Sequence, residues 1–87
     1  MKQPNLLDSV TNLYPIPRDR LTLVESAYDS IINLPRGQIG TIVEIYNRSQ
    51  ESKYLVEFAD SCGEEYAMAI LKAEEILVIS YELSLVS

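Results

Sequence analysis

The chain has 87 residues, of which 47% are hydrophobic and 23% charged, and its formal net charge is −6. This describes one small globular domain and excludes a disordered chain. No apolar run is long enough to span a membrane, and an acidic chain disfavours contact with the phosphates of nucleic acids. The N-terminus lacks a signal-peptide pattern, and the single cysteine, Cys62, can form no internal disulfide. We therefore expect a reducing, cytoplasmic location.

The N-terminal segment differs from the rest of the chain. Leu6, Val10 and Leu13 recur at helical spacing, and a proline follows that would end a helix. We predict a short helix over residues 5–14 within an N-terminal arm spanning 1–18, with an unstructured tail as the alternative. If this arm is ordered, its apolar residues must bury against the domain or against another chain. The three apolar residues are therefore candidate partner-binding residues.

The remaining part of the chain, residues 19–87, has the pattern of a β domain. Short runs of alternating or β-branched residues are separated by polar turns that contain glycine or proline. A helical turn at 72–75 precedes the last core strand, which is typical of SH3-like barrels. We predict a mainly β fold, a small SH3-like five-stranded barrel. The expected strands are 21–28, 38–46, 54–58, 65–71 and 76–79, the last of them fully buried and extended by the alternating tail 81–86.

Three glycines and one polar segment mark the expected turns. Gly37 permits the turn before the second strand, and Gly63 ends a tight turn that begins at Asp60. Gly40 lies inside a strand, where a glycine marks a bulge or a close approach of another backbone. The polar run 47–53 predicts a hairpin loop.

Four segments of this domain resemble, in order, the signature of a bacterial family called domain of unknown function 4926. The resemblance covers about residues 21–80, and the pair Ser61–Cys62 departs from the more acidic pattern of the family. It implies an SH3-like barrel, no established activity and no catalytic residue. Members resemble small companion proteins, some of them beside genes of toxin–antitoxin type. The segments are RGQIGTIVEI from Arg36, YLVEF from Tyr54, GEEYA from Gly63, and Leu71 to Val78.

Enzymatic chemistry finds little support in the sequence. There is no histidine, and the acidic surroundings of Cys62 disfavour a thiolate. Glu64 and Glu65 are neighbours on a strand and point to opposite faces, whereas Glu74 and Glu75 are expected to face water. Neither a metal-ligand spacing nor a phosphate-binding loop occurs. We therefore expect no enzyme, no cofactor and no metal.

Binding to another protein is better supported. The chain has six tyrosines and no tryptophan, and tyrosine is enriched at protein interfaces. Tyr28 and Tyr46 end strands and, with Glu44, are candidate partner-binding residues, whereas Tyr54 and Tyr66 are expected at the edge of the core. The missing tryptophan disfavours recognition of proline-rich peptides. An acidic surface favours a basic partner.

The sequence thus indicates a non-enzymatic, acidic protein-binding module. The first hypothesis is an antitoxin-like or immunity-like companion of a small basic partner protein, and the alternative is an accessory subunit that docks on a larger enzyme. A third hypothesis is a KOW-like RNA-binding barrel, because the glycine pattern is similar, although segment 34–58 carries balanced charge. A fourth is self-association through the strand edge at 81–86.

Overall fold

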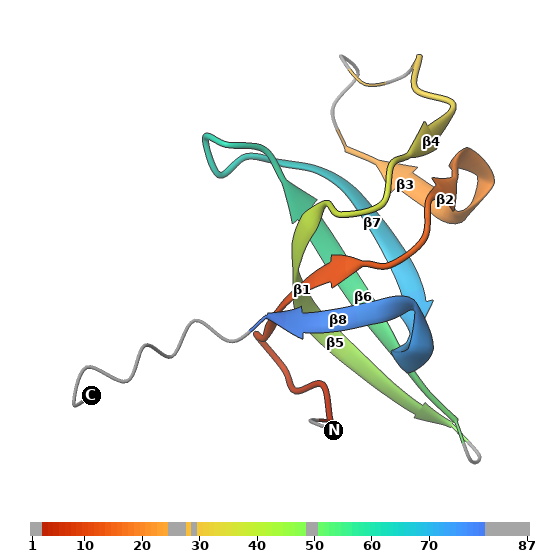
Figure 1. Cartoon of the computed structure of the whole chain (residues 1–87), viewed down its shortest axis with the longest axis vertical. Helices are drawn as coiled ribbons and strands as arrows, with labels where there is room; N and C mark the ends of the chain where they lie inside the picture. The colour runs from red at the N-terminus through yellow and green to blue at the C-terminus, as the bar shows by residue number, and fades with distance from the viewer. Residues whose placement is uncertain (1–2, 25–27, 29, 49–50, 80–87) are drawn as a thin grey trace.

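Figure 1 shows the computed structural model of the chain, which describes residues 3–24, 28, 30–48 and 51–79. The fold is mainly β, as predicted. Within the described residues, no helix is long and apolar enough to cross a membrane. The elements are β1 (Ser9–Asn12), β2 (Ile16–Pro17), η1 (Arg18–Arg20), β3 (Leu21–Leu23), β4 (Asn33–Leu34), β5 (Ile39–Arg48), β6 (Glu51–Ala59), β7 (Glu65–Lys72), η3 (Ala73–Glu75) and β8 (Ile76–Ile79).

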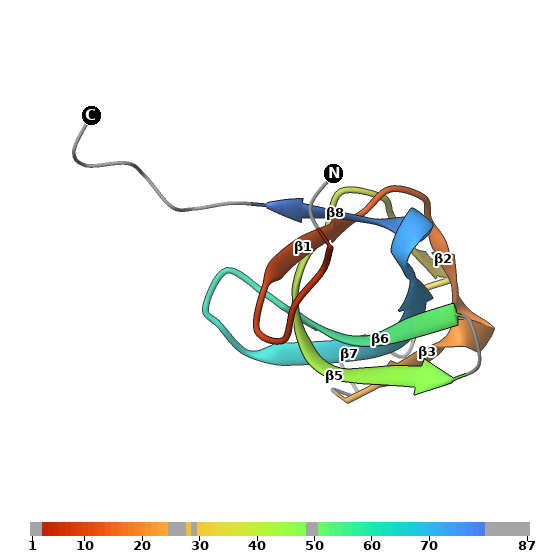
Figure 2. The same ribbon diagram turned by 90° about the horizontal axis from the view of Figure 1, so that it is seen from below.

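Six of the strands form one antiparallel sheet in the order β3-β7-β6-β5-β1-β8, and β2 pairs with β4 in a second, two-stranded sheet. Figure 2 shows how strongly the six-stranded sheet curls around the interior. The expected arrangement had five strands. The strand that it lacked is β1, which lies between β5 and β8.

The predicted helix over residues 5–14 is wrong, because Ser9–Asn12 forms strand β1. Val10 and Asn12 are buried and their neighbours are only half-buried, which is the period of a strand. Backbone pairing with β5 on one side and β8 on the other outweighs the helical spacing of a segment too short to be a stable helix alone. Part of the segment assigned to an arm therefore belongs to the sheet.

The core lies inside the curled sheet and is built from inward-facing residues of its strands, together with Ile16 and Leu34 of the two-stranded sheet. Gly40 on β5 pairs with Phe58 on β6, and a Cβ atom at Gly40 would lie 2.5 Å from Cγ1 of Val56 and 2.9 Å from the carbonyl oxygen of Glu57. The predicted close approach at this glycine is confirmed, while the bulge of β5 falls between Ile42 and Glu44. The core residues are Val10, Ile16, Leu34, Ile42, Tyr54, Val56, Phe58, Tyr66, Ala67, Ala69, Leu71 and Ile76.

Several strand boundaries differ from the sequence-based expectation. The predicted hairpin loop 47–53 is too long, because β5 continues to Arg48 and β6 begins at Glu51, and residues 49–50 between them lie outside the described part of the chain. Ser52 on β6 donates a hydrogen bond of 2.6 Å from its hydroxyl to the side-chain oxygen of Asn47 on β5. These polar side chains stabilise each other across the strands instead of ending them.

The ends of the β domain also differ in detail. The predicted strand 21–28 is described as a strand only over β3, and residues 25–27 lie outside the described part of the chain. Strand β8 is not fully buried, since Leu77 is 55% exposed. The tail 81–86, with the self-association that it suggested, also lies outside the described residues.

Candidate functional site

A groove with a volume of about 440 Å³ opens where the connection before β5 faces the turn between β6 and β7. The two walls meet because Gly40 near the start of β5 pairs with Phe58 near the end of β6. We call this feature the tyrosine groove, because two aromatic rings form part of its lining. It is lined by Tyr28, Gly37, Gln38, Ile39, Ala59, Asp60, Ser61 and Tyr66.

The first wall is held by Asn12, a buried polar residue of β1 that is only 2% exposed. Its side-chain NH2 group donates to the carbonyl oxygens of Tyr14 at 2.9 Å and Pro35 at 3.0 Å, and its side-chain oxygen accepts from the backbone N–H of Gln38 at 2.8 Å. The backbone N–H of Gly37 also donates to the Asn12 carbonyl at 2.8 Å. The one side-chain amide thus satisfies two backbone groups of the turn, at Pro35 and Gln38, and a third at Tyr14 after β1.

The conformation of this turn needs a glycine. Gly37 has φ +85°, in the left-handed region that a residue with a side chain rarely adopts. The predicted structural role of Gly37 is therefore confirmed. Together with the Asn12 amide, it fixes the path of the chain into β5.

The second wall is the turn between β6 and β7, organised by Asp60. One carboxylate oxygen, Oδ1, accepts hydrogen bonds of 2.9 Å from the backbone N–H groups of Cys62 and Glu64. The backbone N–H of Asp60 donates to the Glu64 carbonyl at 2.9 Å, and Gly63, with φ +82°, donates to the Asp60 carbonyl at 2.9 Å. The predicted turn and its glycine are confirmed.

The rings of Tyr28 and Tyr66 stack in the groove, with centroids 4.7 Å apart and an angle of 28° between their planes. Tyr66 is 7% exposed, whereas Tyr28 is half-buried. Burial raises the pKa of the Tyr66 hydroxyl, and the neighbouring Tyr28 and Asp60 raise it further. The hydroxyl therefore stays protonated and can donate a hydrogen bond at neutral pH.

Tyr66 enters the groove because of an irregularity in the sheet. The register of β6 and β7 shifts between Phe58 and Ala59, so that Tyr66 and Ala67 are both buried although they are adjacent. A regular alternation predicts Tyr66 on the opposite face from Ala67. The bulge turns its ring toward the interior and toward Tyr28.

A carboxylate pair lies near the second wall. The pKa of Glu65 on β7 is raised, mainly by burial. The negative charge of Glu57 on the adjacent strand β6 and a hydrogen bond with the Glu57 carboxyl group raise it further. One oxygen of Glu65, Oε2, is buried and has no hydrogen-bond partner among the described residues. This pair adds negative charge beside the turn that contains Asp60.

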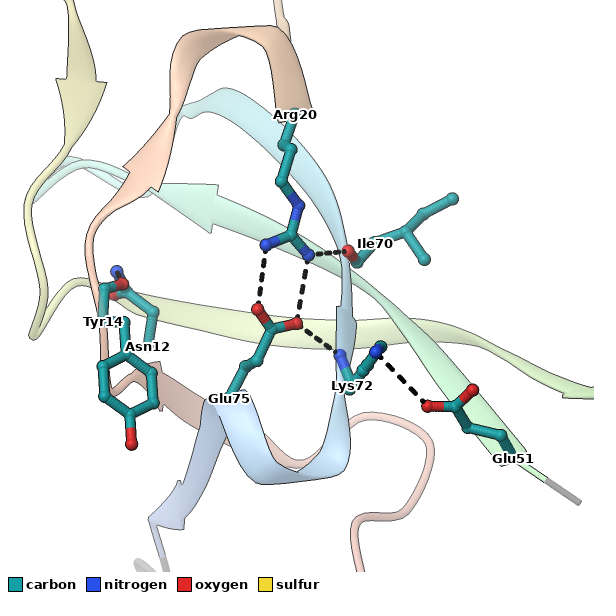
Figure 3. A network of polar contacts seen from close by, with 7 residues as sticks. All are labelled: Asn12, Tyr14, Arg20, Glu51, Ile70, Lys72 and Glu75. Carbon is teal, nitrogen blue, oxygen red and sulfur yellow. Dashed lines mark hydrogen bonds and ion pairs between the residues drawn. The ribbon is translucent and has the colours of Figure 1, made fainter.

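A separate polar network lies at the opposite end of β7 (Figure 3). The guanidinium of Arg20 forms two hydrogen bonds with the carboxylate of Glu75, of 2.8 Å and 3.0 Å, and a third of 3.1 Å with the carbonyl of Ile70. Glu75 also accepts a 2.8 Å hydrogen bond from the backbone N–H of Lys72. The expectation that Glu75 simply faces water is therefore wrong, and its role is to tie η1 to η3.

The sequence-predicted binding residues do not converge on one surface. Of the three candidates on the N-terminal segment, Leu6 is 55% and Leu13 38% exposed, but Val10 is 0% exposed because it pairs with Gly40 in the core. The prediction that Val10 contacts a partner is wrong for this reason. Leu6 and Leu13 remain available at the surface.

Among the other candidates, only Tyr28 lies in the tyrosine groove. Tyr46 and Glu44 lie on β5, where they pair with Lys53 and Leu55 of β6, beyond the bulge and away from the groove. The sequence did not indicate the remaining groove residues as a site. The turn at Asp60 was recognisable, but its position opposite Gln38 depends on the pairing of β5 with β6, which sequence patterns do not reveal.

The structure offers no obvious catalytic or metal centre within the part of the chain that it describes. Cys62 is exposed in the turn between β6 and β7. Histidine, cysteine and carboxylate side chains form no group of three or more that could hold a metal ion among the described residues. The tyrosine groove is therefore the candidate site that the geometry favours.

Comparison with known proteins gives one result. The model of a family described as "Domain of unknown function (DUF4926)" matches residues 6–78. No curated protein and no solved structure matches the chain. The match begins before β1 and ends within β8, so it includes the N-terminal strand that the resemblance over 21–80 omitted.

Proposed function

The chain belongs to the family described as Domain of unknown function (DUF4926), and on that premise we propose that it is a non-enzymatic protein-binding module whose partner docks in the tyrosine groove. The observation that carries the proposal is the stacked pair Tyr28 and Tyr66, set between two turns in an open groove. Tyrosine combines a large apolar surface with a polar end, and interfaces use it for that reason.

The rigidity of both walls supports the proposal. Asn12 holds the wall before β5 through two side-chain hydrogen bonds, with Pro35 and Gln38, and Asp60 holds the opposite wall through two. A groove that is already formed loses little conformational entropy when a partner binds. Its volume of about 440 Å³ suits a few side chains of a docked segment, and lies at the low end of the range for small-molecule pockets.

The rim of the groove supplies apolar contact area. Ile39, the first residue of β5, is 47% exposed and lines the groove together with Ala59 and the two tyrosines. An exposed branched side chain next to aromatic rings is the kind of contact that a partner buries. The groove thus combines an apolar rim, aromatic rings and a carboxylate.

Two biological roles fit such a module. The first is a companion of the antitoxin or immunity type that binds a small basic protein, which the net charge of −6 favours. The second is an accessory subunit docked on a larger enzyme. A short reading frame adjacent to the gene favours the first role, and a metabolic operon favours the second.

A matched pair of variants tests the proposal. Ile39→Lys changes the rim of the groove, and Ile70→Lys makes the same change on β7, where the side chain is also 47% exposed but lies outside the groove. Tagged wild-type protein and both variants are used to capture partners from cells of the native host. We expect a protein that wild type and Ile70→Lys retain in equal amount and that Ile39→Lys loses. Equal retention by all three, with both variants folded, would refute the groove as the docking site.

A further inference from the structure

We propose that the tyrosine groove receives a cationic side chain of the partner, arginine in preference to lysine, between the ring of Tyr28 and the carboxylate of Asp60. This rests on the proposed function, because it takes the groove to be the docking site. It adds which type of partner side chain the groove binds. The charge, the aromatic rings and the surroundings of the groove each support it.

The carboxylate of Asp60 has one oxygen that can accept a hydrogen bond from a partner. Oδ1 is occupied by the backbone N–H groups of Cys62 and Glu64, whereas Oδ2 has no hydrogen-bond partner among the described residues. Asp60 is half-buried and lines the groove. A charged donor on Oδ2 forms a charge-assisted hydrogen bond, which is stronger than a neutral one.

The aromatic rings favour a flat cation. Tyr66 is buried and stacked on Tyr28, so the pair presents an aromatic surface that is held in place. A cation within about 6 Å of a tyrosine ring is attracted by the electrons of its face, and arginine makes such contacts more often than lysine. The planar guanidinium can stack on a ring while its N–H groups reach a carboxylate, which the compact ammonium of lysine does less well.

The charges around the groove point the same way. Among the described residues, none that lines the groove is basic. Glu64 follows the turn and is exposed, and Glu65 beside it faces Glu57. Arg36 precedes Gly37 and is exposed, so it adds one positive charge near the first wall. The carboxylates outnumber it, and a cationic segment therefore gains favourable electrostatic energy on approach.

The test is a titration of the ¹⁵N-labelled full chain, followed by the amide signals in two-dimensional NMR spectra. The probes are Nα-acetyl-arginine methylamide, the lysine analogue, and the citrulline analogue, which has nearly the shape of arginine without its charge. We expect arginine to shift the amides of Gln38, Ile39 and Ser61. Lysine should bind more weakly, and citrulline should bind roughly tenfold more weakly or not detectably.

Two variants with the same change in net charge locate the effect. Asp60→Asn keeps a side-chain oxygen for the N–H groups of Cys62 and Glu64, so the turn is preserved while the charge is lost. Glu74→Gln removes a charge from η3, at the other end of β7, where the side chain is exposed. We expect Asp60→Asn to weaken arginine binding roughly tenfold and Glu74→Gln to leave it unchanged.

The outcomes separate this inference from the proposed function. Equal binding of arginine and citrulline, shifts confined to residues outside the groove, or equal weakening by the two variants would each overturn the inference. If Ile39→Lys still loses a partner that Asp60→Asn retains fully, the groove is a docking site but it does not select a cation. If Ile39→Lys retains the captured partner, the proposal that the partner docks in the tyrosine groove is refuted, independently of the result with Asp60→Asn.

Discussion

Arg20 and Glu75 form an ion pair that joins the two ends of the six-stranded sheet. Arg20 ends η1 directly before β3, and Glu75 ends η3 directly before β8, and these two strands are the outer strands of the sheet. Their side chains meet through two hydrogen bonds of 2.8 Å and 3.0 Å. The pair therefore links elements that no strand pairing connects.

The ion pair makes stability dependent on acidity. The hydrogen bond with Arg20 lowers the pKa of Glu75 below its ordinary value. The contribution of the ion pair to folding stability is therefore fully present above the pKa that Glu75 has in the unfolded chain. It is lost as the pH falls through the lower pKa that Glu75 has in the folded protein. Because Arg20 is partly exposed, we expect Glu75→Gln to cost on the order of 1 kcal/mol at neutral pH. Thermal melts should show this difference disappear in acid. A difference that persists at the lowest pH would contradict this account of the pair.

The carboxylate pair Glu57 and Glu65 gives stability the opposite dependence on pH. The pKa of Glu65 is raised in the folded protein. The contribution of Glu65 to stability is therefore most favourable below the pKa that it has in the unfolded chain, and is lost as the pH rises through its higher pKa in the folded protein. Glu65→Gln removes the repulsion and supplies an N–H donor to Glu57. We expect a higher melting temperature than wild type at neutral pH and no difference in acid. A variant that is less stable than wild type at neutral pH would show that the charge is compensated.

The buried amide of Asn12 should be one of the most sensitive polar groups of the described structure. Asn12→Ala leaves the carbonyls of Tyr14 and Pro35 and the N–H of Gln38 without their partner. We expect a loss of about 3 kcal/mol in urea unfolding and faster hydrogen exchange at Gln38. Ser52→Ala, which removes an exposed hydrogen bond at the far end of β6, serves as the control and should change little.

Two glycines should respond differently to alanine. Gly40→Ala brings a Cβ to 2.5 Å from Val56 and 2.9 Å from a backbone oxygen of Glu57, so we expect a cost of about 1–3 kcal/mol from overpacking. At Gly63 nothing lies within 4 Å, but φ is +82°, and an alanine there costs about 1–2 kcal/mol through backbone strain. Combining Gly40→Ala with Val56→Ala should recover part of the stability that Gly40→Ala loses. Combining Gly63→Ala with Val56→Ala should recover none of the stability that Gly63→Ala loses. Chemical denaturation of the five variants (the two glycine variants, Val56→Ala alone and the two double variants) measures both effects, and no recovery at Gly40 would refute the contact with Val56.

Much of the β domain was predictable from local pattern. The strands after Gly37 alternate or are β-branched, and the turn at Asp60 and the helical turn before β8 carry their own signals. Strand β1 was missed because one of its two buried residues is Asn12, a polar residue whose burial depends on backbone groups 23 and 26 residues away. A local pattern contains no information on such a partner.

The candidate site was predictable only in part. Tyr28 was identified because a tyrosine at a strand end is a typical interface residue, and it lies in the groove. Asp60 and Gln38 were not, because they come together only through the pairing of β5 with β6. Tyr66 enters the groove through the register shift after Phe58, which an alternating sequence pattern cannot reveal.

The central claim, that a partner protein docks in the tyrosine groove, is tested most directly by hydrogen–deuterium exchange of the chain alone and in its captured complex. We predict that the complex slows exchange at Gln38, Ile39 and Ser61 and leaves the amide of Ile70 unchanged. Slower exchange at β8 or β3, with the three groove amides unaffected, would contradict the claim and assign the interface to an edge of the sheet.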